Sequence, residues 1–469
     1  MRELAPDLCI IGAGSGGLSL AAGAAQLGAH TVLVERHKMG GDCLNYGCVP
    51  SKSLLAAAHI CHAARRAEGF GLHSQGRPDY QKAQAHLRRV IAEIAPHDSV
   101  ERFTKLGAHV ISEEAQFVSP REVVAGRHRI RARYFVIATG SRPFVPPIAG
   151  LETVPYLTNE TLFDLKETPR HLAIIGGGPI GCEMAQAHCR LGIKVSLFEA
   201  ERILPRDDAE LVAPVRDALR RDGVELFEGA AIAKIGPHRE GVAIHARGAP
   251  PHIASHVLVA TGRRPNLEAL QLDKAKVAWT PQGVQLDARL RSTNRRVFAI
   301  GDAAGGAQFT HAASYHAGIA LRNILFRLPA AWQPRRVPHV TYTSPELAQL
   351  GPSEAELKAA KKLKEVLRKP FAENDRARAE DATEGGVKVC IGARGRVLSV
   401  GIVGAHAGDL LAPWALAMDK GLPLSALANQ LVPYPTRSET SKYAAGAYYT
   451  PRLFSRRGRQ LVRLLRALP

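Results

Sequence analysis

The sequence predicts an α/β protein with two Rossmann-like dinucleotide-binding domains, each a doubly wound parallel sheet, and a C-terminal α+β domain. The first two domains are predicted from a pattern that occurs twice. It consists of a short apolar strand, the motif Gly-x-Gly-x-x-Gly, a helix of small residues and a second strand that ends in an acidic residue. The third domain is predicted from a change near Pro338, after which this alternation stops.

The first copy of the pattern has predicted strands over residues 7–11 and 31–35 and a helix that ends near Gly28. In such a motif the first glycine allows a tight turn, the second lets the backbone approach a pyrophosphate, and the third lets the helix pack close to the strand. A carboxylate at the end of the second strand would accept hydrogen bonds from a ribose. The predicted binding residues are Gly12, Gly14, Gly17 and Glu35.

The second copy has predicted strands over residues 171–175 and 194–199 and a helix that ends near Leu191. Its predicted binding residues are Gly176, Gly178, Gly181 and Glu199. A carboxylate at position 199 bonds a free 2′-hydroxyl and repels a 2′-phosphate, which favours NADH over NADPH. Arg202 and Arg206 follow closely and could accommodate the phosphate, so NADPH stays an alternative.

The remaining chain supplies further predicted strands and helices. Strands over residues 134–140 and 256–262 each end in Ala-Thr-Gly, and another strand over residues 297–302 ends in Asp302. After Pro338 the predicted elements are strands over residues 341–343, 387–391 and 397–403, and helices over residues 353–369, 410–420 and beyond 436. The expected domains are residues 1–150 with 271–335, residues 151–270, and residues 336–469.

A cysteine pair follows the first glycine motif in the run Gly41-Asp42-Cys43-Leu44-Asn45-Tyr46-Gly47-Cys48-Val49-Pro50-Ser51-Lys52. A disulfide accepts two electrons, as a flavin does, so a dithiol beside a redox dinucleotide indicates electron transfer to or from sulfur. Pro50 and Ser51 are predicted to begin a helix that runs to about Arg66. Its unpaired amides and dipole would lower the pKa of Cys48.

Composition and charge exclude several classes of protein. Seven scattered cysteines among 469 residues argue against a secreted disulfide framework and favour a reducing, cytoplasmic compartment. Cysteine and histidine spacings predict no metal site. The uncharged residues 10–29 contain six glycines and are too polar for a convincing membrane span. The net charge of +19 favours anionic partners, but few aromatic residues and no binding motif argue against nucleic acid.

The C-terminal residues 451–469 contain six arginines and no acidic residue. Leu461, Leu464, Leu465 and Leu468 have helical spacing, which predicts an amphipathic basic helix. Such a helix would either make weak contact with an anionic membrane surface or pack on the rest of the protein with its arginines in solvent.

Taken together, these motifs resemble the pyridine-nucleotide disulfide oxidoreductases, which include dihydrolipoyl dehydrogenase, glutathione reductase and mercuric reductase. The resemblance covers nearly the whole chain and also rests on residues 299–302 and 435–439. It implies a homodimer formed through the last domain, with FAD on the first motif, NAD(P)H on the second and a redox-active Cys43–Cys48 disulfide. Asp302 would reach the flavin's ribityl chain. We also expect Gly41, Thr139, Gly140 and Gly262 to contact a cofactor.

The resemblance also assigns catalytic roles. Cys48 would lie next to the flavin and Cys43 would attack a small disulfide or thiol substrate. Lys52 would lie beside the flavin, paired with Glu183, and stabilise its negative charge. Asp42 would raise the pKa of Cys43 if it faced the thiol, but it could equally point away. These roles predict a dihydrolipoyl dehydrogenase-like enzyme.

One departure concerns Tyr434, which stands where disulfide reductases of this family usually have a histidine base oriented by the residue matching Glu439. A phenol is a poor base at neutral pH, and loss of a positioned base typically costs about 10²–10⁴ in rate. Tyrosine here is a feature of mercuric reductases, so a soft metal ion is the alternative substrate. No Cys-x-x-Cys domain precedes the core and the last cysteine is Cys390, which argues against efficient mercury delivery. A third reading is an electron-transfer flavoprotein on a membrane surface.

Overall fold

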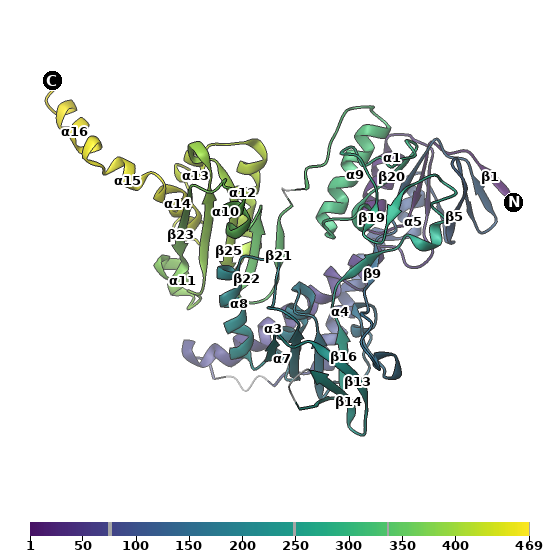
Figure 1. The fold of residues 1–469 in the computed structure, drawn as a ribbon, viewed down its shortest axis with the longest axis horizontal. Helices are drawn as coiled ribbons and strands as arrows, with labels where there is room; N and C mark the ends of the chain where they lie inside the picture. Colours follow the sequence, from purple (N-terminus) through teal and green to yellow (C-terminus); the bar gives the residue numbers. More distant parts are fainter. Residues whose placement is uncertain (74–76, 247–249, 335–336, 469) are drawn as a thin grey trace. The chain divides into compact units, whose positions relative to one another are not determined.

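The computed structural model describes residues 1–73, 77–246, 250–334 and 337–468 (Figure 1). The chain divides into two compact units. Unit 1 comprises residues 1–176, 187–200 and 230–334, and unit 2 comprises residues 177–186, 201–229 and 335–469. The four-segment domain boundaries expected from the sequence stay a prediction. No described helix combines the length and the apolar character needed to cross a membrane.

Unit 1 contains a five-stranded parallel sheet in the order β20-β8-β2-β3-β4. Apolar side chains are buried on both faces, which explains why its strands are continuously hydrophobic. Helices α1 and α9 cover one face and pack against each other. These elements are β2 (Leu8–Ile11), α1 (Ser15–Gln26), β3 (Thr31–Val34), β4 (Ala108–Ile111), β8 (Tyr134–Ile137), β20 (Val297–Ala299) and α9 (Thr310–Ile324).

A second parallel arrangement in unit 1 places β10 between β11 and β16. The chain between β11 and β16 also forms an antiparallel sheet in the order β13-β14-β15. The bounds are β10 (His171–Ile175), β11 (Lys194–Glu199), β13 (Ile232–His238), β14 (Gly241–Ala246), β15 (His252–Ala254) and β16 (His256–Val259). Helix α7 (Pro179–Arg190) follows β10. The strands predicted over residues 171–175 and 194–199 are therefore confirmed.

The other elements of unit 1 are shorter sheets and the helices around the cysteine pair. One sheet has the order β1-β7-β6-β5, and β9 pairs with β17, and β18 with β19. The bounds are β1 (Arg2–Leu4), α2 (Gly41–Asn45), α3 (Cys48–Arg66), α4 (Tyr80–Ile94), α5 (Val100–Lys105), β5 (Ala115–Ser119), β6 (Glu122–Ala125), β7 (His128–Ile130), β9 (Ser141–Pro143), α6 (Asn159–Leu162), β17 (Arg263–Pro265), β18 (Trp279–Thr280) and β19 (Gly283–Val284).

Unit 2 is built on the antiparallel sheet β21-β22-β25-β24-β23, packed against helices around the buried Trp414. The part of unit 2 after residue 337 has the α+β organisation predicted for the C-terminal domain, whereas α8 and β12 come from earlier in the chain. The elements of unit 2 are α8 (Ala209–Asp222), β12 (Glu225–Glu228), β21 (His339–Thr341), β22 (Glu346–Leu350), α10 (Glu354–Ala359), β23 (Glu365–Pro370), α11 (Asp375–Ala379), β24 (Gly386–Ile391), β25 (Val397–Gly404), α12 (Ala407–Lys420), α13 (Leu424–Ala428), α14 (Ser438–Ala447), α15 (Thr450–Leu453) and α16 (Arg456–Leu465).

The helix predicted over residues 353–369 was wrong in its second half. A capping box between Ser353 and Glu356 starts α10 as expected, but the helix ends at Ala359. Lys361 then adopts a positive φ of 54°, which stops an α-helix. The following residues form β23, since they pair with β24 along its whole length.

Candidate active site

The cysteine pair lies at a break between two helices of unit 1. Cys43 is inside α2, and Cys48 is the first residue of α3, after Gly47 in a non-helical conformation. Both are thiols in this structure, Cys43 half-buried and Cys48 exposed. The predicted helix start is thereby confirmed, and it places the Cys48 sulfur at a helix N-terminus.

The surroundings of Cys48 favour its thiolate form. Its pKa is lowered to about 6, first by a hydrogen bond from Cys43 and then by Thr310 and the charge of Lys52. Although the residue is exposed, neighbouring groups keep part of the water from its sulfur, and this desolvation acts in the opposite direction. The Thr310 Oγ1 lies 3.4 Å from the Cys48 Sγ. Thr310 is the first residue of α9, so residues from two helix N-termini meet at this sulfur.

The pKa of Cys43 is raised, chiefly because its proton is held in the hydrogen bond to Cys48 and because the thiol is partly buried. The negative charge of the dithiol therefore lies on Cys48. The positive charge of Lys52, one helical turn after Cys48, also favours the Cys48 thiolate.

Asp42 is held by partners from distant segments. Its Oδ1 accepts a hydrogen bond from the Asn159 Nδ2 at 3.0 Å and pairs with an Arg263 guanidinium nitrogen at 3.0 Å. Its charge still contributes to the raised pKa of Cys43, as the last of five causes. Asp42 therefore raises the pKa of Cys43, as one of the two alternatives left open by the sequence predicts. The effect is small because Arg263 pairs with the carboxylate and partly neutralises its charge.

The first glycine motif has the geometry that each position predicts. Gly12 has a φ of +109°, and a Cβ there would lie 2.3 Å from the Ala138 oxygen. A Cβ on Gly17 would lie 1.9 Å from the Gly12 oxygen. At Gly14, by contrast, the nearest atom would be the Gly41 Cα at 4.0 Å. Gly12 and Gly17 are needed for the protein's own packing, whereas Gly14 leaves space above the loop.

Two carboxylates lie after strands of the same parallel sheet. Glu35 follows β3, and its two oxygens accept hydrogen bonds from the backbone amides of Ala13 (2.6 Å) and His37 (2.8 Å). Asp302 follows β20, and its Oδ2 accepts a hydrogen bond from Ser141 at 2.5 Å. Burial raises the pKa of Asp302. Because carboxyl ends of parallel strands meet at one edge, both acids border the space above the glycine loop.

The second glycine motif repeats the first turn. Gly176 has a φ of +107°, and a Cβ there would lie 2.5 Å from the Ala260 oxygen. A Cβ on Gly178 would meet nothing within 4 Å. Glu199 is the last residue of β11 and is half-buried. In both candidate sites the first glycine has a positive φ and no room for a Cβ, and the second glycine has open space beside it.

The other residues predicted to contact a cofactor are four glycines and one threonine. Gly41 approaches the first motif, since a Cβ on it would lie 2.7 Å from the Gly14 Cα. Gly140 and Gly262 have positive φ values, +65° and +128°, and open surroundings. The Thr139 hydroxyl donates to the Asn266 carbonyl at 2.7 Å. Gly181 lies in the first turn of α7.

Glu183 is 4% exposed in α7, and its Oε1 accepts a hydrogen bond from the Tyr342 amide at 3.0 Å. Glu183 belongs to unit 2 and Lys52 to unit 1. Their pairing therefore stays a prediction.

Tyr434 is 72% exposed, and its hydroxyl donates to the Asp375 Oδ2 at 3.1 Å. This hydrogen bond raises the pKa of the phenol. Glu439 is buried, and its oxygens accept from the Thr436 amide and the Tyr443 hydroxyl instead. Glu439 therefore does not orient Tyr434, and the raised pKa keeps the phenol protonated at neutral pH, so that it does not serve as a base.

The comparisons with known proteins agree with this geometry. Residues 6–317 match the family described as pyridine nucleotide-disulphide oxidoreductase, and residues 337–445 match its dimerisation domain. The chain belongs to the pyridine nucleotide-disulphide oxidoreductase family. The dimerisation domain indicates a homodimer.

Two similar relatives carry different names. Mercuric reductase from Staphylococcus aureus is 33% identical over 94% of this chain and 82% of the relative. Dihydrolipoyl dehydrogenase from Thermus scotoductus is 35% identical over 94% of this chain and 97% of the relative. Among solved structures, the Cu(II) complex of the HOCl-induced flavoprotein disulfide reductase RclA from Escherichia coli has a TM-score of 0.85 at 28% identity and covers 93% of this chain and 98% of that one.

Enzymes of this family use FAD and NAD(P)H, and the predicted α/β class, flavoenzyme activity and cofactors are thereby confirmed. The residues present suit a flavin dinucleotide. A Cβ at Gly14 would fill space that the loop leaves open, and Glu35 and Asp302 offer oxygens at the same edge.

Four residues around the site were not predicted from the sequence, and each comes from another segment. They are Thr310 beside Cys48, Asn159 and Arg263 beside Asp42, and Ser141 beside Asp302. The Arg263 Nε also donates to the Ser141 Oγ at 2.7 Å. The sequence contained one signal for two of them. Ser141 and Arg263 belong to the Ser-Arg-Pro and Arg-Arg-Pro turns after the two Ala-Thr-Gly strands, and these turns pair as β9 and β17.

Proposed function

We propose that this flavoenzyme passes two electrons from NADH to the Cys43–Cys48 pair and from there to an acceptor that bonds to sulfur. The observation that supports it is the dithiol itself, with a low-pKa thiolate at the start of α3 and a protonated partner thiol hydrogen-bonded to it. FAD, when bound, takes up two electrons from the nicotinamide and delivers them to the disulfide.

NADH is favoured as the reductant by two residues. Glu199 offers a carboxylate at the end of β11. The Arg202 guanidinium, which could have neutralised a 2′-phosphate, instead donates to the carbonyls of Leu204, Pro205 and Asp207 at 2.6–3.2 Å. A lower KM for NADH than for NADPH tests this preference.

The acceptor that the site supports best is a soft metal ion held by thiolates. An organic disulfide requires Cys43 to lose its proton to a base before it attacks, and the Tyr434 phenol, whose pKa is raised by its hydrogen bond to Asp375, does not supply such a base at neutral pH. A thiophilic metal ion removes this requirement, because a coordinating thiol is deprotonated on binding. The names of similar proteins, mercuric reductase and a Cu(II) complex of RclA, agree with this class of acceptor.

The electrons balance for both ions. Each NADH supplies two electrons, which reduce one Hg(II) ion to the metal or two Cu(II) ions to Cu(I), while the dithiol is oxidised and then regenerated. A small disulfide of the lipoamide type is the second candidate, because the relatives named dihydrolipoyl dehydrogenase cover nearly all of the chain. Its reduction would yield two thiols per NADH.

An anaerobic assay of NADH oxidation separates these acceptors. The acceptors are Hg(II) with excess thiol, Cu(II) without added thiol, oxidised lipoamide and glutathione disulfide. We expect the metal ions to give the highest turnover, and Cys43→Ser and Cys48→Ser to abolish it. Activity that survives both substitutions would refute the role of the dithiol, and faster turnover with a disulfide would favour the second candidate.

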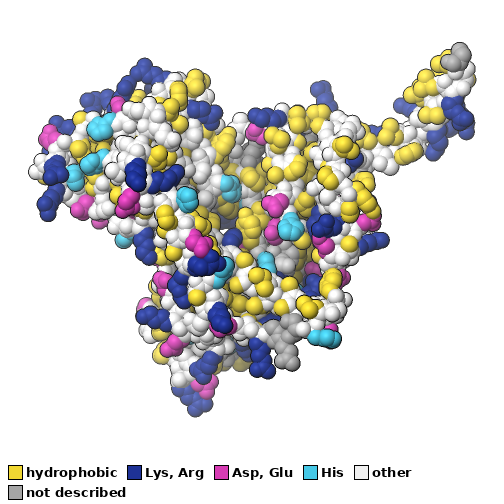
Figure 2. All heavy atoms as spheres, turned by 180° about the vertical axis from the view of Figure 1, so that it is seen from behind, with side chains coloured by type: hydrophobic (Ala, Val, Ile, Leu, Met, Phe, Trp, Pro, Cys, Tyr) yellow, Lys and Arg dark blue, Asp and Glu magenta, His cyan; other side chains and the backbone are white. Residues whose placement is uncertain are grey.

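We also propose that the C-terminal tail makes contact with an anionic membrane surface. Every residue from Arg459 to Leu468 is exposed, so the folded chain does not cover α16. Figure 2 shows its hydrophobic and arginine side chains on different sides of the helix. Such a helix lies in a bilayer interface with its apolar side inserted. A second copy of a chain with a net charge of +19 is a poor partner for six arginines.

Flotation with vesicles of phosphatidylcholine, alone or mixed with phosphatidylglycerol, tests this proposal. We expect binding only to the mixed vesicles and a loss of it with Leu461→Asp and Leu465→Asp in one variant. Each arginine near such a surface contributes about 1 kcal/mol, so Arg463→Gln should weaken binding several-fold. Leu27→Asp, an exposed leucine in unit 1, is the matched control. Equal flotation of all variants would contradict the proposal. We also propose a reducing, cytoplasmic location, which the seven scattered cysteines of the sequence favour.

A further inference from the structure

Two histidines of unit 1 converge at the start of strands that belong to different sheets. His171 is the first residue of β10, and His252 is the first residue of β15. Their Nε2 atoms are 3.3 Å apart. These residues lie at the amino end of β10, whereas the second glycine motif follows its carboxyl end, so the pair is separate from the nucleotide-binding loop.

Neighbouring side chains hold both rings in place. The Ser196 Oγ, from β11, lies 2.8 Å from each Nε2, and Ser196 is fully buried. The planes of the two imidazole rings are nearly perpendicular, at 79°, and the ring centroids are 4.9 Å apart. The Phe198 and His252 rings pack edge to face, with their centroids 5.4 Å apart. The nitrogens therefore point at one place with little freedom to turn.

The distance between the nitrogens matches one coordination geometry. With metal–nitrogen bonds of about 2.05 Å, a separation of 3.3 Å corresponds to a nitrogen–metal–nitrogen angle of about 107°, close to tetrahedral. A square-planar ion with similar bonds would bring neighbouring nitrogens to about 2.8–2.9 Å, closer than observed. Tetrahedral geometry and imidazole ligands are typical of Zn²⁺.

We propose that His171 and His252 form a zinc site that is distinct from the cysteine pair. The two imidazoles supply half of a tetrahedral set, which leaves the other two positions for oxygen ligands. Because the ligands come from β10 and β15, a bound ion would tie the parallel and antiparallel sheets of unit 1 together. The sequence did not indicate this site, since the two histidines are far apart in the chain and follow no zinc-finger spacing.

Titration of the dialysed, FAD-loaded protein with ZnCl₂ tests the proposal. All variants carry Cys43→Ser and Cys48→Ser, so that the active-site thiols do not compete for the ion. The test variants are His171→Gln and His252→Gln, whose amides can keep a hydrogen bond to Ser196 but are poor zinc ligands. His238→Gln, on the exposed end of β13, is the matched control.

We expect one Zn²⁺ per chain by calorimetry, at least tenfold weaker binding in either test variant, and unchanged binding in the control. Zinc should also raise the melting temperature of the parent and the control, but not that of the test variants. Melting temperatures without zinc show whether each variant folds. A weakening of less than tenfold in either folded variant, or no zinc binding by the parent, would leave only a hydrogen-bonded histidine pair and overturn the proposal.

Discussion

At the scale of single residues, the charge on Cys48 depends on one hydroxyl from another helix. Thr310→Val removes the hydrogen bond to Cys48 and keeps the shape of the side chain. Because a hydrogen bond to a charged group contributes about 1.5–3 kcal/mol, and about 1.4 kcal/mol is one pKa unit, we expect the pKa of Cys48 to rise from about 6 by one unit or more. The pH dependence of alkylation of the reduced enzyme measures it.

The sign of this effect is specific. A lowered pKa means that alkylation is already fast above pH 6, and the variant should reach the same rate only at higher pH. Thr153→Val, an exposed threonine that bonds only its own turn in the contacts described, serves as the control. An unchanged pH profile in Thr310→Val would show that Cys43, the helix N-terminus and Lys52 set the thiolate charge without Thr310.

We expect Tyr434 to influence which acceptor the enzyme uses. Tyr434→His places a base with a pKa near neutrality at this position, and a positioned base contributes about 10²–10⁴ in rate. We expect reduction of oxidised lipoamide to rise at least tenfold, while metal-ion reduction changes little. Tyr434→Phe, which removes only the hydroxyl, should raise neither the reduction of lipoamide nor the reduction of metal ions. No gain with histidine would mean that the substrate pocket, not the missing base, excludes lipoamide.

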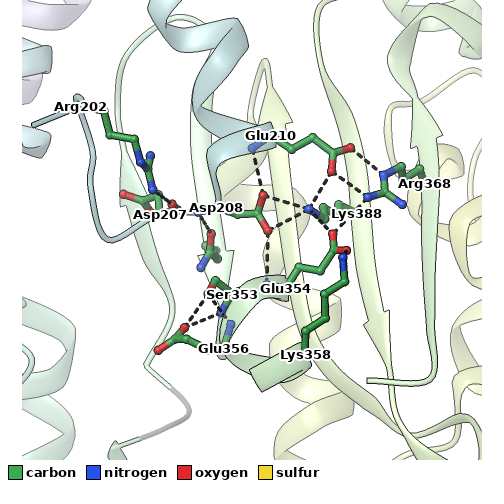
Figure 3. Close-up of polar contacts among 11 residues, drawn as sticks. Arg202, Asp207, Asp208, Glu210, Ser353, Glu354, Glu356, Lys358, Arg368 and Lys388 are labelled. Atoms are coloured by element: carbon green, nitrogen blue, oxygen red, sulfur yellow. Dashed lines mark hydrogen bonds and ion pairs between the residues drawn. The ribbon is translucent and has the colours of Figure 1, made fainter. Parts of the chain in front are cut away.

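At the scale of elements, a charge cluster joins two helix starts to the sheet of unit 2 (Figure 3). Lys388, on β24 and 6% exposed in its side chain, contacts Asp208, Glu210 and Glu354 at 2.7–2.8 Å. Burial alone would lower the pKa of Lys388, but these hydrogen bonds raise it. Asp208 caps α8, Glu354 begins α10, and Arg368 of β23 completes the cluster.

Lys388→Met should therefore destabilise the protein strongly. It removes the cation paired with the buried Asp208 carboxylate, and breaking a buried ion pair in this way costs about 3–5 kcal/mol. Lys358→Met is the control, because Lys358 pairs with the same Glu354 but is 64% exposed, and exposed pairs contribute about 0–1 kcal/mol. Urea unfolding followed by circular dichroism measures both. Equal losses would show that the cluster gains nothing from burial.

The same cluster predicts a loss of stability in acid. The pKa of Glu354 is lowered to about 2, first by Lys358 and then by Lys388, and that of Glu210 to about 2, first by Arg368. Carboxyls whose folded pKa is depressed stabilise the fold above their unfolded pKa of about 4.3, and this contribution is lost as pH falls toward 2. We expect the difference in unfolding free energy between parent and Lys388→Met to shrink from pH 5 to pH 3. A constant difference would contradict this linkage.

The elements also show which features the sequence could predict. The glycine motifs, the strands beside them and the start of α3 are local, and each was predicted because the turn or cap is decided by neighbouring residues. The contacts of Asp42 and Cys48 depend on Arg263, Asn159 and Thr310, which tertiary folding brings near. Residues 365–369 were predicted as helix because their strand conformation depends on pairing with β24.

At the scale of the whole molecule, the dimerisation domain leaves apolar side chains uncovered in a single chain. Leu431 is 97% exposed, Leu416 57% and Leu422 46%. All three lie within residues 337–445, which match the dimerisation domain. Isolated exposed leucines are ordinary, but a group of them in one domain of an oligomeric family indicates a contact with the partner subunit.

Leu431→Asp should consequently weaken the homodimer. A charge buried at an interface without a partner is costly, and charged residues are depleted from interface cores. We expect light scattering after size-exclusion chromatography to show about half the parent mass at low micromolar concentration. Leu27→Asp, 52% exposed in unit 1, should leave the mass unchanged. If Leu431→Asp stays dimeric while it folds normally, the leucine lies outside the interface, and the exposed side chains of α12 and its following turn become the segment to test, beginning with Leu416→Asp.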